Sequence, residues 1–155
     1  MDALLSRLDM PKGKRVPYRE EIHHPALFEP EIATGTVWAL ADGALMRDQV
    51  TPHREIAEIR DNVLRLRSAP EGEPVIYPIP ANVSQALGPI RMLLTGKQMD
   101  QDLVVMENDE HGWRLFFGAD TATRAQVFGC GARPRGVKTE DVSGVRRTTW
   151  FLDPP

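Results

Sequence analysis

The chain has 155 residues, of which 41% are hydrophobic and 26% charged, and its formal net charge is -3. These values are typical of one globular domain, long enough to bury about 70% of its unfolded surface without disulfides or metals. The balance of 19 Lys+Arg against 22 Asp+Glu argues against a strong general attraction to nucleic acid or anionic membranes. One cysteine excludes an internal disulfide, and 13 prolines with 12 glycines favour short strands joined by turns.

The sequence contains no recognisable segment for membrane insertion or export. No stretch approaches the ~20 apolar residues of a membrane-spanning helix. Residues 1–9 lack the basic region and the long apolar run of a signal peptide. The protein is therefore expected to be cytosolic or to have lost a signal peptide, and a single cysteine is compatible with either compartment.

The first predicted elements are a short helix and two strands. Residues 3–9 place leucines on one side of an amphipathic helix. From Val16 onward apolar and polar residues alternate, which predicts a half-buried strand, and Pro17 puts this strand at an edge or a bulge. The clearest strand is 32–40, which is apolar on both faces, so it is either covered on both sides or lines an apolar cavity with one face.

Turn signals divide much of the remaining chain into short strands. Ala41-Asp42-Gly43 and Asp61-Asn62 are typical of hairpin turns. The further strands that we predict are 44–51, 55–60, 63–67, 102–108, 112–117, 125–130 and 145–152.

One longer helix is predicted at 82–95. Apolar residues recur there at helical spacing, Gly96 is suited to end the helix, and Pro89 should kink or split it. The whole chain, 1–155, is therefore predicted to be a single α+β domain, in which one or two helices cover one face of a meandering antiparallel sheet.

The histidines and the cysteine could bind a metal or take part in catalysis, but each of them also has a structural explanation. His23 and His24 are adjacent on a predicted strand, so they point to opposite faces and are poorly placed to share a metal. His53 and His111 lie at turn signals. Cys130 lies between two glycines without a local base, which is typical of a small strand residue.

Charged runs are interpreted as solvated surface. The acidic residues between Asp100 and Glu110 alternate with apolar ones, as on a strand, and the basic run 133–138 is expected to be a surface loop. The sequence contains no phosphate-binding glycine loop, no nucleophile-elbow serine and no paired CxxC. We therefore predict no catalytic residue, no metal site and no cofactor.

The apolar residues allow two interpretations. They are spread over many strands and the 82–95 helix, and they either fill an ordinary core or enclose an apolar pocket. Methionines would suit an adaptable wall that faces a lipid. Periodicity alone does not separate these two possibilities.

Several segments, taken in order, match a known pattern: the amphipathic residues 4–9, the strand Gly35-Thr36-Val37-Trp38-Ala39-Leu40, the hairpin around Thr51-Pro52, the strands within 56–66, the helix ending at Leu94-Thr95-Gly96-Lys97, and the hairpin around Gly112-Trp113-Arg114-Leu115. In this arrangement the chain resembles the LolA-like family of periplasmic lipoprotein and lipid carriers. The resemblance covers nearly the whole chain.

The resemblance implies a fold of the LolA, LolB and LppX type: a strongly curved antiparallel sheet, or incomplete β-barrel, with helices over its open face. It also implies a carrier or binding protein for a hydrophobic, acyl-containing ligand in the bacterial periplasm, its signal peptide removed. Its partners would be an acyl-chain lipid or lipoprotein and membrane donor and acceptor proteins, and not nucleic acid. On this hypothesis the ligand-binding wall and lid residues are Trp38, Leu40, Leu64, Leu66, Leu87, Ile90 and Leu94.

Two departures from the family pattern concern the signal peptide, which the sequence lacks, and the arginine that gates the cavity. The standard carrier has an arginine in the turn after the tryptophan strand, whereas here the nearest arginine is Arg47, in the next strand. The same fold is also used by small cytosolic enzymes of pigment biosynthesis. A small enzyme of secondary metabolism is therefore the alternative, with Tyr18, Tyr77, Arg47 or Glu20 as its polar groups, and an interaction module with a filled core is the third hypothesis.

Overall fold

The computed structural model describes residues 14–79, 93–94, 103–117, 124–141 and 143–152, and its strands form one antiparallel sheet. The 11 strands are β1 (Val16–His23), β2 (Glu31–Ala39), β3 (Leu45–Thr51), β4 (Glu55–Arg60), β5 (Val63–Arg67), β6 (Val75–Pro78), β7 (Leu103–Asp109), β8 (Gly112–Phe117), β9 (Arg124–Cys130), β10 (Arg133–Glu140) and β11 (Arg146–Phe151).

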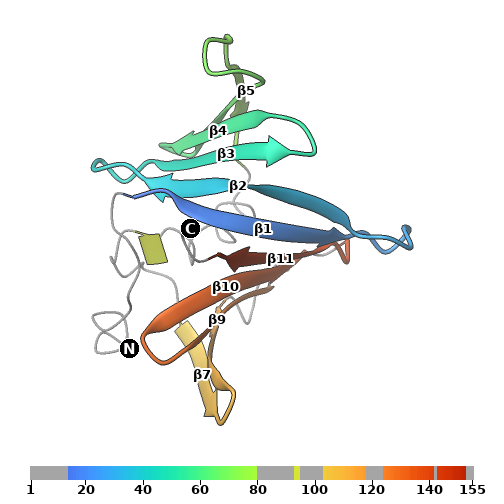
Figure 1. Ribbon diagram of the computed structural model, residues 1–155, viewed down its shortest axis with the longest axis vertical. Helices are drawn as coiled ribbons and strands as arrows, with labels where there is room; N and C mark the ends of the chain where they lie inside the picture. Colours follow the sequence, from blue (N-terminus) through green and yellow to red (C-terminus); the bar gives the residue numbers. More distant parts are fainter. Residues whose placement is uncertain (1–13, 80–92, 95–102, 118–123, 142, 153–155) are drawn as a thin grey trace.

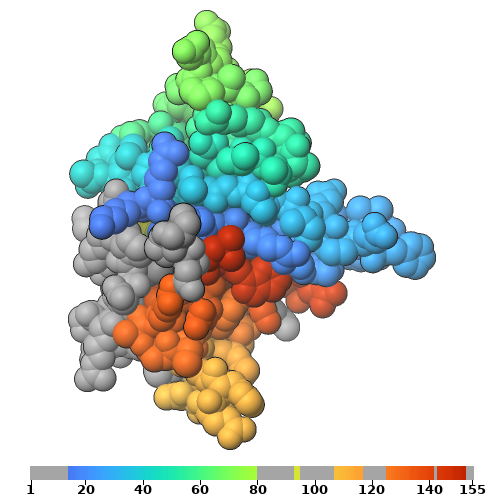
Figure 2. All heavy atoms as spheres, in the orientation of Figure 1, coloured from blue at the N-terminus to red at the C-terminus, as the bar shows by residue number. Residues whose placement is uncertain are grey.

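Two meanders make up the sheet. Its strand order is β6-β5-β4-β3-β2-β1-β11-β10-β9-β8-β7, so consecutive strands are neighbours except where the chain passes from β6 to β7. The first and last strands, β1 and β11, pair in the middle and join the two meanders. Strands β6 and β7 are the two ends of an open, strongly twisted sheet, and these ends project at opposite poles of the molecule (Figures 1 and 2).

The alternating pattern of the sequence explains why these segments are strands. In β1 every second residue is buried, from Val16 to Ile22, which confirms the predicted half-buried strand. The predicted strand 32–40 is confirmed as β2. The expected hairpin at Asp61-Asn62 joins β4 to β5, and both residues have positive φ, as a type I′ hairpin turn requires.

The main core lies on one face near the middle of the sheet. It consists of the buried residues Val16, Tyr18, Val37, Ala39, Leu45 and Leu94, against which Ile59 and Phe151 pack. A second group of buried residues lies on the other meander: Trp113, Leu115, Ala125, Val127 and Val137.

The prediction of an α+β fold with helices over the sheet is wrong for the described residues, which form an all-β, open sheet. The segments with helical periodicity, 3–9 and 82–95, lie outside the described residues, apart from Leu93 and Leu94, which are helical and buried. Period-two alternation and frequent turns characterise the described strands. No helix in the described ranges is long and apolar enough to cross a membrane.

Two strands were not predicted. The basic run 133–138 is not a surface loop but part of β10, in which Val137 is fully buried. Pro134 is accommodated because the register with β9 shifts between Pro134 and Gly136. The short strand β6 is exposed along its whole length, so burial gave it no alternating pattern.

Candidate functional site

The candidate site lies on the face of the sheet that contacts Leu94, called here the inner face. Directly paired residues of neighbouring strands share a face, so the strand register assigns its members. From β6 to β8 they include Val75 and Tyr77; Leu64 and Leu66; Glu55, Ala57 and Ile59; Leu45, Arg47 and Gln49; Glu31, Ala33, Gly35, Val37 and Ala39; Val16, Tyr18, Glu20 and Ile22; Arg147, Thr149 and Phe151; Val137 and Thr139; Ala125, Val127 and Gly129; Trp113 and Leu115. Most of them are apolar.

Small residues on β2 leave space in the middle of this face. Ala33 is paired with Glu20, and Gly35 is paired with Tyr18 on one side and Gln49 on the other. Because Gly35 has no side chain, Arg47 on β3 can cross β2 to reach β1. Its Nε donates a hydrogen bond to the Tyr18 hydroxyl at 2.7 Å.

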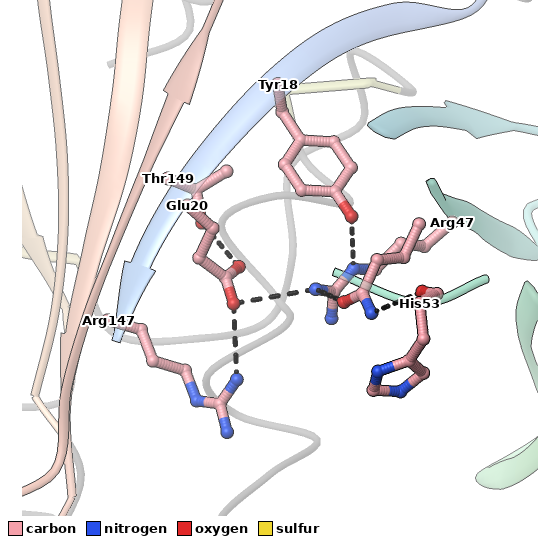
Figure 3. Close-up of polar contacts among 7 residues, drawn as sticks. Tyr18, Glu20, Arg47, His53, Arg147 and Thr149 are labelled. Atoms are coloured by element: carbon pink, nitrogen blue, oxygen red, sulfur yellow. Dashed lines mark hydrogen bonds and ion pairs between the residues drawn. The ribbon is translucent and has the colours of Figure 1, made fainter. Parts of the chain in front are cut away.

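A group of polar side chains meets at this point, and we call it the Glu20 cluster: Tyr18, Glu20, Arg47, Gln49, Arg147 and Thr149. Figure 3 labels all of them except Gln49, and it shows the labelled side chains pointing toward one another from β1, β3 and β11.

Glu20 is the centre of the cluster, and its side chain is only 9% exposed. Its Oε2 accepts a hydrogen bond from the Thr149 hydroxyl at 3.0 Å. Its Oε1 faces two guanidinium groups: Arg147 Nη1 donates to it at 3.3 Å, and Arg47 Nη2 lies 3.6 Å away. A carboxylate buried in this way is stabilised only because charged and hydroxyl donors surround it.

The rest of the cluster holds Arg47 in place. Its Nη2 also donates to Gln49 Oε1 at 3.0 Å, and Gln49 Nε2 in turn donates to the backbone carbonyl of His53 at 3.0 Å. The guanidinium lies 5.3 Å from the centre of the Tyr18 ring. Arg47 is therefore held through both its Nε and its Nη2 rather than by a single ion pair.

Two members of the cluster have shifted pKa values. Burial disfavours the Tyr18 phenolate, and this effect outweighs the nearby Arg47, so the pKa of Tyr18 is raised. Burial alone would lower the pKa of Arg47, but attraction to Glu20 and the contact with Tyr18 hold this pKa above its usual value. At neutral pH the cluster therefore presents a neutral phenol and a charged guanidinium.

The predicted wall and lid residues are not all on one face. Leu64 and Leu66 lie on the inner face, and Leu94 is in the main core. Trp38 is on the opposite, outer face, where Arg15 lies 4.0 Å from the centre of its ring. Leu40 is exposed in the β2–β3 hairpin. Leu87 and Ile90 lie outside the described residues.

The polar groups named for the enzyme hypothesis are only partly brought together. Tyr18, Glu20 and Arg47 meet, whereas Tyr77 is paired with Leu64 on the end strand β6 and is exposed. Sequence reasoning missed Arg147 and Thr149. Alternation puts these two on one face of their strand, but no local signal shows that this strand pairs with β1.

The histidines and the cysteine have no shared site in the structure. His23 contacts Glu21, and His24 contacts Glu31 on the neighbouring strand. Cys130 is exposed. Within the described part of the chain, no group of three histidine, cysteine or acidic side chains is arranged to hold a metal ion.

Comparison with known proteins bears on the fold. The chain is similar to the crystal structure of a LolA superfamily protein from Nitrosomonas europaea, with a TM-score of 0.55 and 11% sequence identity over 97% of this chain and 90% of that one. The chain has a LolA-like fold. The resemblance inferred from the sequence is thus confirmed at the level of the fold.

The other comparisons add little to the LolA-like assignment. A match to the MucA/MucB complex of Pseudomonas aeruginosa has a TM-score of 0.36 and 12% identity, and it covers 99% of this chain but only 58% of that one. No family model and no curated protein matches the sequence.

Proposed function

We propose that the protein is a carrier or binding protein for a hydrophobic, acyl-containing ligand, which lies against the inner face of the sheet. The observation that supports this proposal best is the LolA-like fold over 97% of the chain. The composition of the inner face is consistent with it, because apolar residues flank a small polar cluster, as in many small-molecule sites.

The half of the inner face beyond β3 offers the apolar surface. Ile59, Leu64 and Leu66 are half-buried there, so they have surface left for a ligand to cover. Apolar burial contributes about 0.8 kcal/mol per methylene. For a chain of about ten carbons this gain exceeds the entropy that the chain loses when it is immobilised.

A fluorescent fatty-acid probe tests the proposal directly. The wild-type protein should bind it saturably, and an unlabelled fatty acid should displace it. Leu64→Gln on the inner face should weaken binding by roughly tenfold, because it removes about 1.5 kcal/mol or more of apolar contact.

The matched control is Ile56→Gln on the same hairpin but on the outer face, since Ile56 pairs with Asp48 and Arg67. This variant should bind like the wild type. Absence of saturable, competable binding by the wild type would refute the proposal.

The proposed site of action is the bacterial periplasm, where the ligand would pass between a membrane donor and an acceptor protein. Fractionation of cells that express the complete gene tests this location. Recovery in the cytoplasmic fraction alone would contradict it.

A small enzyme is the second candidate, because Tyr18, Glu20 and Arg47 converge on the inner face. Mass spectrometry of molecules that co-purify with wild-type protein and with Tyr18→Phe separates the two. The same molecule in both samples supports a carrier, whereas a precursor that accumulates only in Tyr18→Phe supports an enzyme.

A further inference from the structure

The Glu20 cluster contains more charged hydrogen-bond donors than its one central acceptor, the Glu20 carboxylate, can pair with. Two guanidinium groups face a single oxygen, Glu20 Oε1, at 3.3 Å and 3.6 Å. Hydrogen bonds between a charged nitrogen and a carboxylate oxygen are usually about 2.7–2.9 Å long. Neither guanidinium therefore makes a short ionic bond to this oxygen.

Arg147 is the less occupied of the two. Among the described residues the only hydrogen bond of its side chain is the one to Glu20, and this side chain is 49% exposed. Because a guanidinium has five N–H donors in a planar fork, Arg147 can accept a second, bidentate anion without losing Glu20.

Three other carboxylates influence the charge of the cluster from farther away. Glu55 acts on Arg47, Asp48 acts on Tyr18, and Arg147 acts on Asp141. In the described part of the chain none of the three bonds the guanidinium of Arg47 or Arg147. Asp48 instead accepts hydrogen bonds from Arg54, and Asp141 caps its own turn at Ser143 and Val145. Among the groups in direct contact, two cations, Arg47 and Arg147, therefore face one anion, Glu20.

We infer that Arg47 and Arg147 bind the anionic head group of the acyl ligand, a carboxylate or a phosphate monoester. This inference rests on the proposed function and adds the chemical class of the head group. The head would bridge the two guanidiniums beside Glu20, where Thr139 is the cross-strand neighbour of Arg147 on the inner face. The tail would extend from there over the apolar surface formed by Ile59, Leu64 and Leu66.

Competition by four ligands of equal chain length tests this inference: a fatty acid, an alkyl phosphate, a fatty-acid methyl ester and a fatty alcohol. The wild type should bind the fatty acid and the alkyl phosphate roughly tenfold to a hundredfold more tightly than the two neutral ligands, which is the range expected for charged hydrogen bonds.

Variants of Arg147 assign the selectivity to this residue. Arg147→Met should reduce the preference for anions, measured as the ratio of fatty-acid to methyl-ester affinity of the same variant, to less than about threefold, and Arg147→Lys should restore part of the preference. Arg19→Met is the matched control, because Arg19 lies on the outer face 5.6 Å from the Trp150 ring, and it should keep the full preference.

The outcomes separate the two proposals. Equal affinity of the wild type for the ester and the fatty acid would overturn the head-group inference but leave the carrier function standing. Inorganic phosphate that competes as strongly as the alkyl phosphate would overturn both proposals, since the acyl tail would then contribute nothing to binding. Failure of all four ligands to bind would overturn the proposed function and the inference together.

Discussion

Glu20 is a carboxylate on the inner face of a strand whose other inward residues are Val16, Tyr18 and Ile22. A charge at such a position is stable only with its partners, and these come from β3 and β11. The cost of removing one side of a buried ion pair is set by the charge that remains.

We predict that Glu20→Gln lowers the free energy of unfolding by about 1–3 kcal/mol. The usual loss for a broken buried pair is larger, but both arginines are partly exposed to solvent, at 29% and 49%, and water screens them. Urea denaturation measures the change. Glu21→Gln, on the outer face of the same strand, is the control and should change stability less.

We predict that the free energy of unfolding falls at alkaline pH because of Tyr18. Its folded-state pKa is raised above the ordinary value near 10, so the folded protein keeps the phenol proton longer than the unfolded chain does. This stabilisation is fully present below the ordinary value and is lost as the pH rises through the folded pKa.

Urea midpoints measured from neutral to strongly alkaline pH check this prediction. The wild-type midpoint should fall more steeply above the ordinary tyrosine pKa than that of Tyr18→Phe, which has no phenol to titrate. Parallel curves for the two proteins would contradict the assignment.

Among the strands, β2 controls whether the Glu20 cluster can form. Its register with β3 shifts between Thr34 and Gly35, and a Cβ at Gly35 would overlap the backbone carbonyl oxygen of Asp48. Gly35 thus allows both the close approach of the strands and the path of Arg47 across them.

We predict that Gly35→Ala destabilises the protein by about 1–3 kcal/mol or more, as overpacking against backbone typically does. It should also weaken any binding at the Glu20 cluster. Thermal denaturation of Gly35→Ala and of Gly72→Ala provides the comparison, since the nearest atom to a Cβ at Gly72 is the Ala69 carbonyl oxygen at 3.3 Å. Equal stability of the two variants would show that the close approach at Gly35 is unimportant.

At the scale of the whole molecule, the pairing of β1 with β11 holds the two meanders together. Thr148 in β11 pairs with Glu21 in β1 and with Lys138 in β10. A proline there would remove a ladder hydrogen bond and strain the centre of the sheet.

We expect Thr148→Pro to abolish cooperative unfolding, whereas Val75→Pro should be tolerated because Val75 is the first residue of the end strand β6. Circular dichroism during thermal unfolding distinguishes the two. A cooperative transition in Thr148→Pro would contradict a central role for this pairing.

Local pattern predicted most strands because alternation and turn residues act over a few positions. The strands from β1 to β5 follow it, as do β7 to β9 and β11. Strand β10 was missed because its pairing with β9 and β11, rather than its own composition, makes it a strand. The binding residues were predicted less well, since Trp38 and Leu64 lie on opposite faces and no local rule relates positions that far apart.

The sequence by itself determined a succession of short antiparallel strands, because period-two alternation, prolines and glycines restrict each segment locally. Its order of segments was enough to indicate the LolA-like fold. Only the tertiary structure decided that the described chain forms an open all-β sheet, and that Glu20, Arg47 and Arg147 share one point of it. The physical reason is the pairing of β1 with β11, which joins residues from opposite ends of the chain through backbone hydrogen bonds that no local pattern specifies.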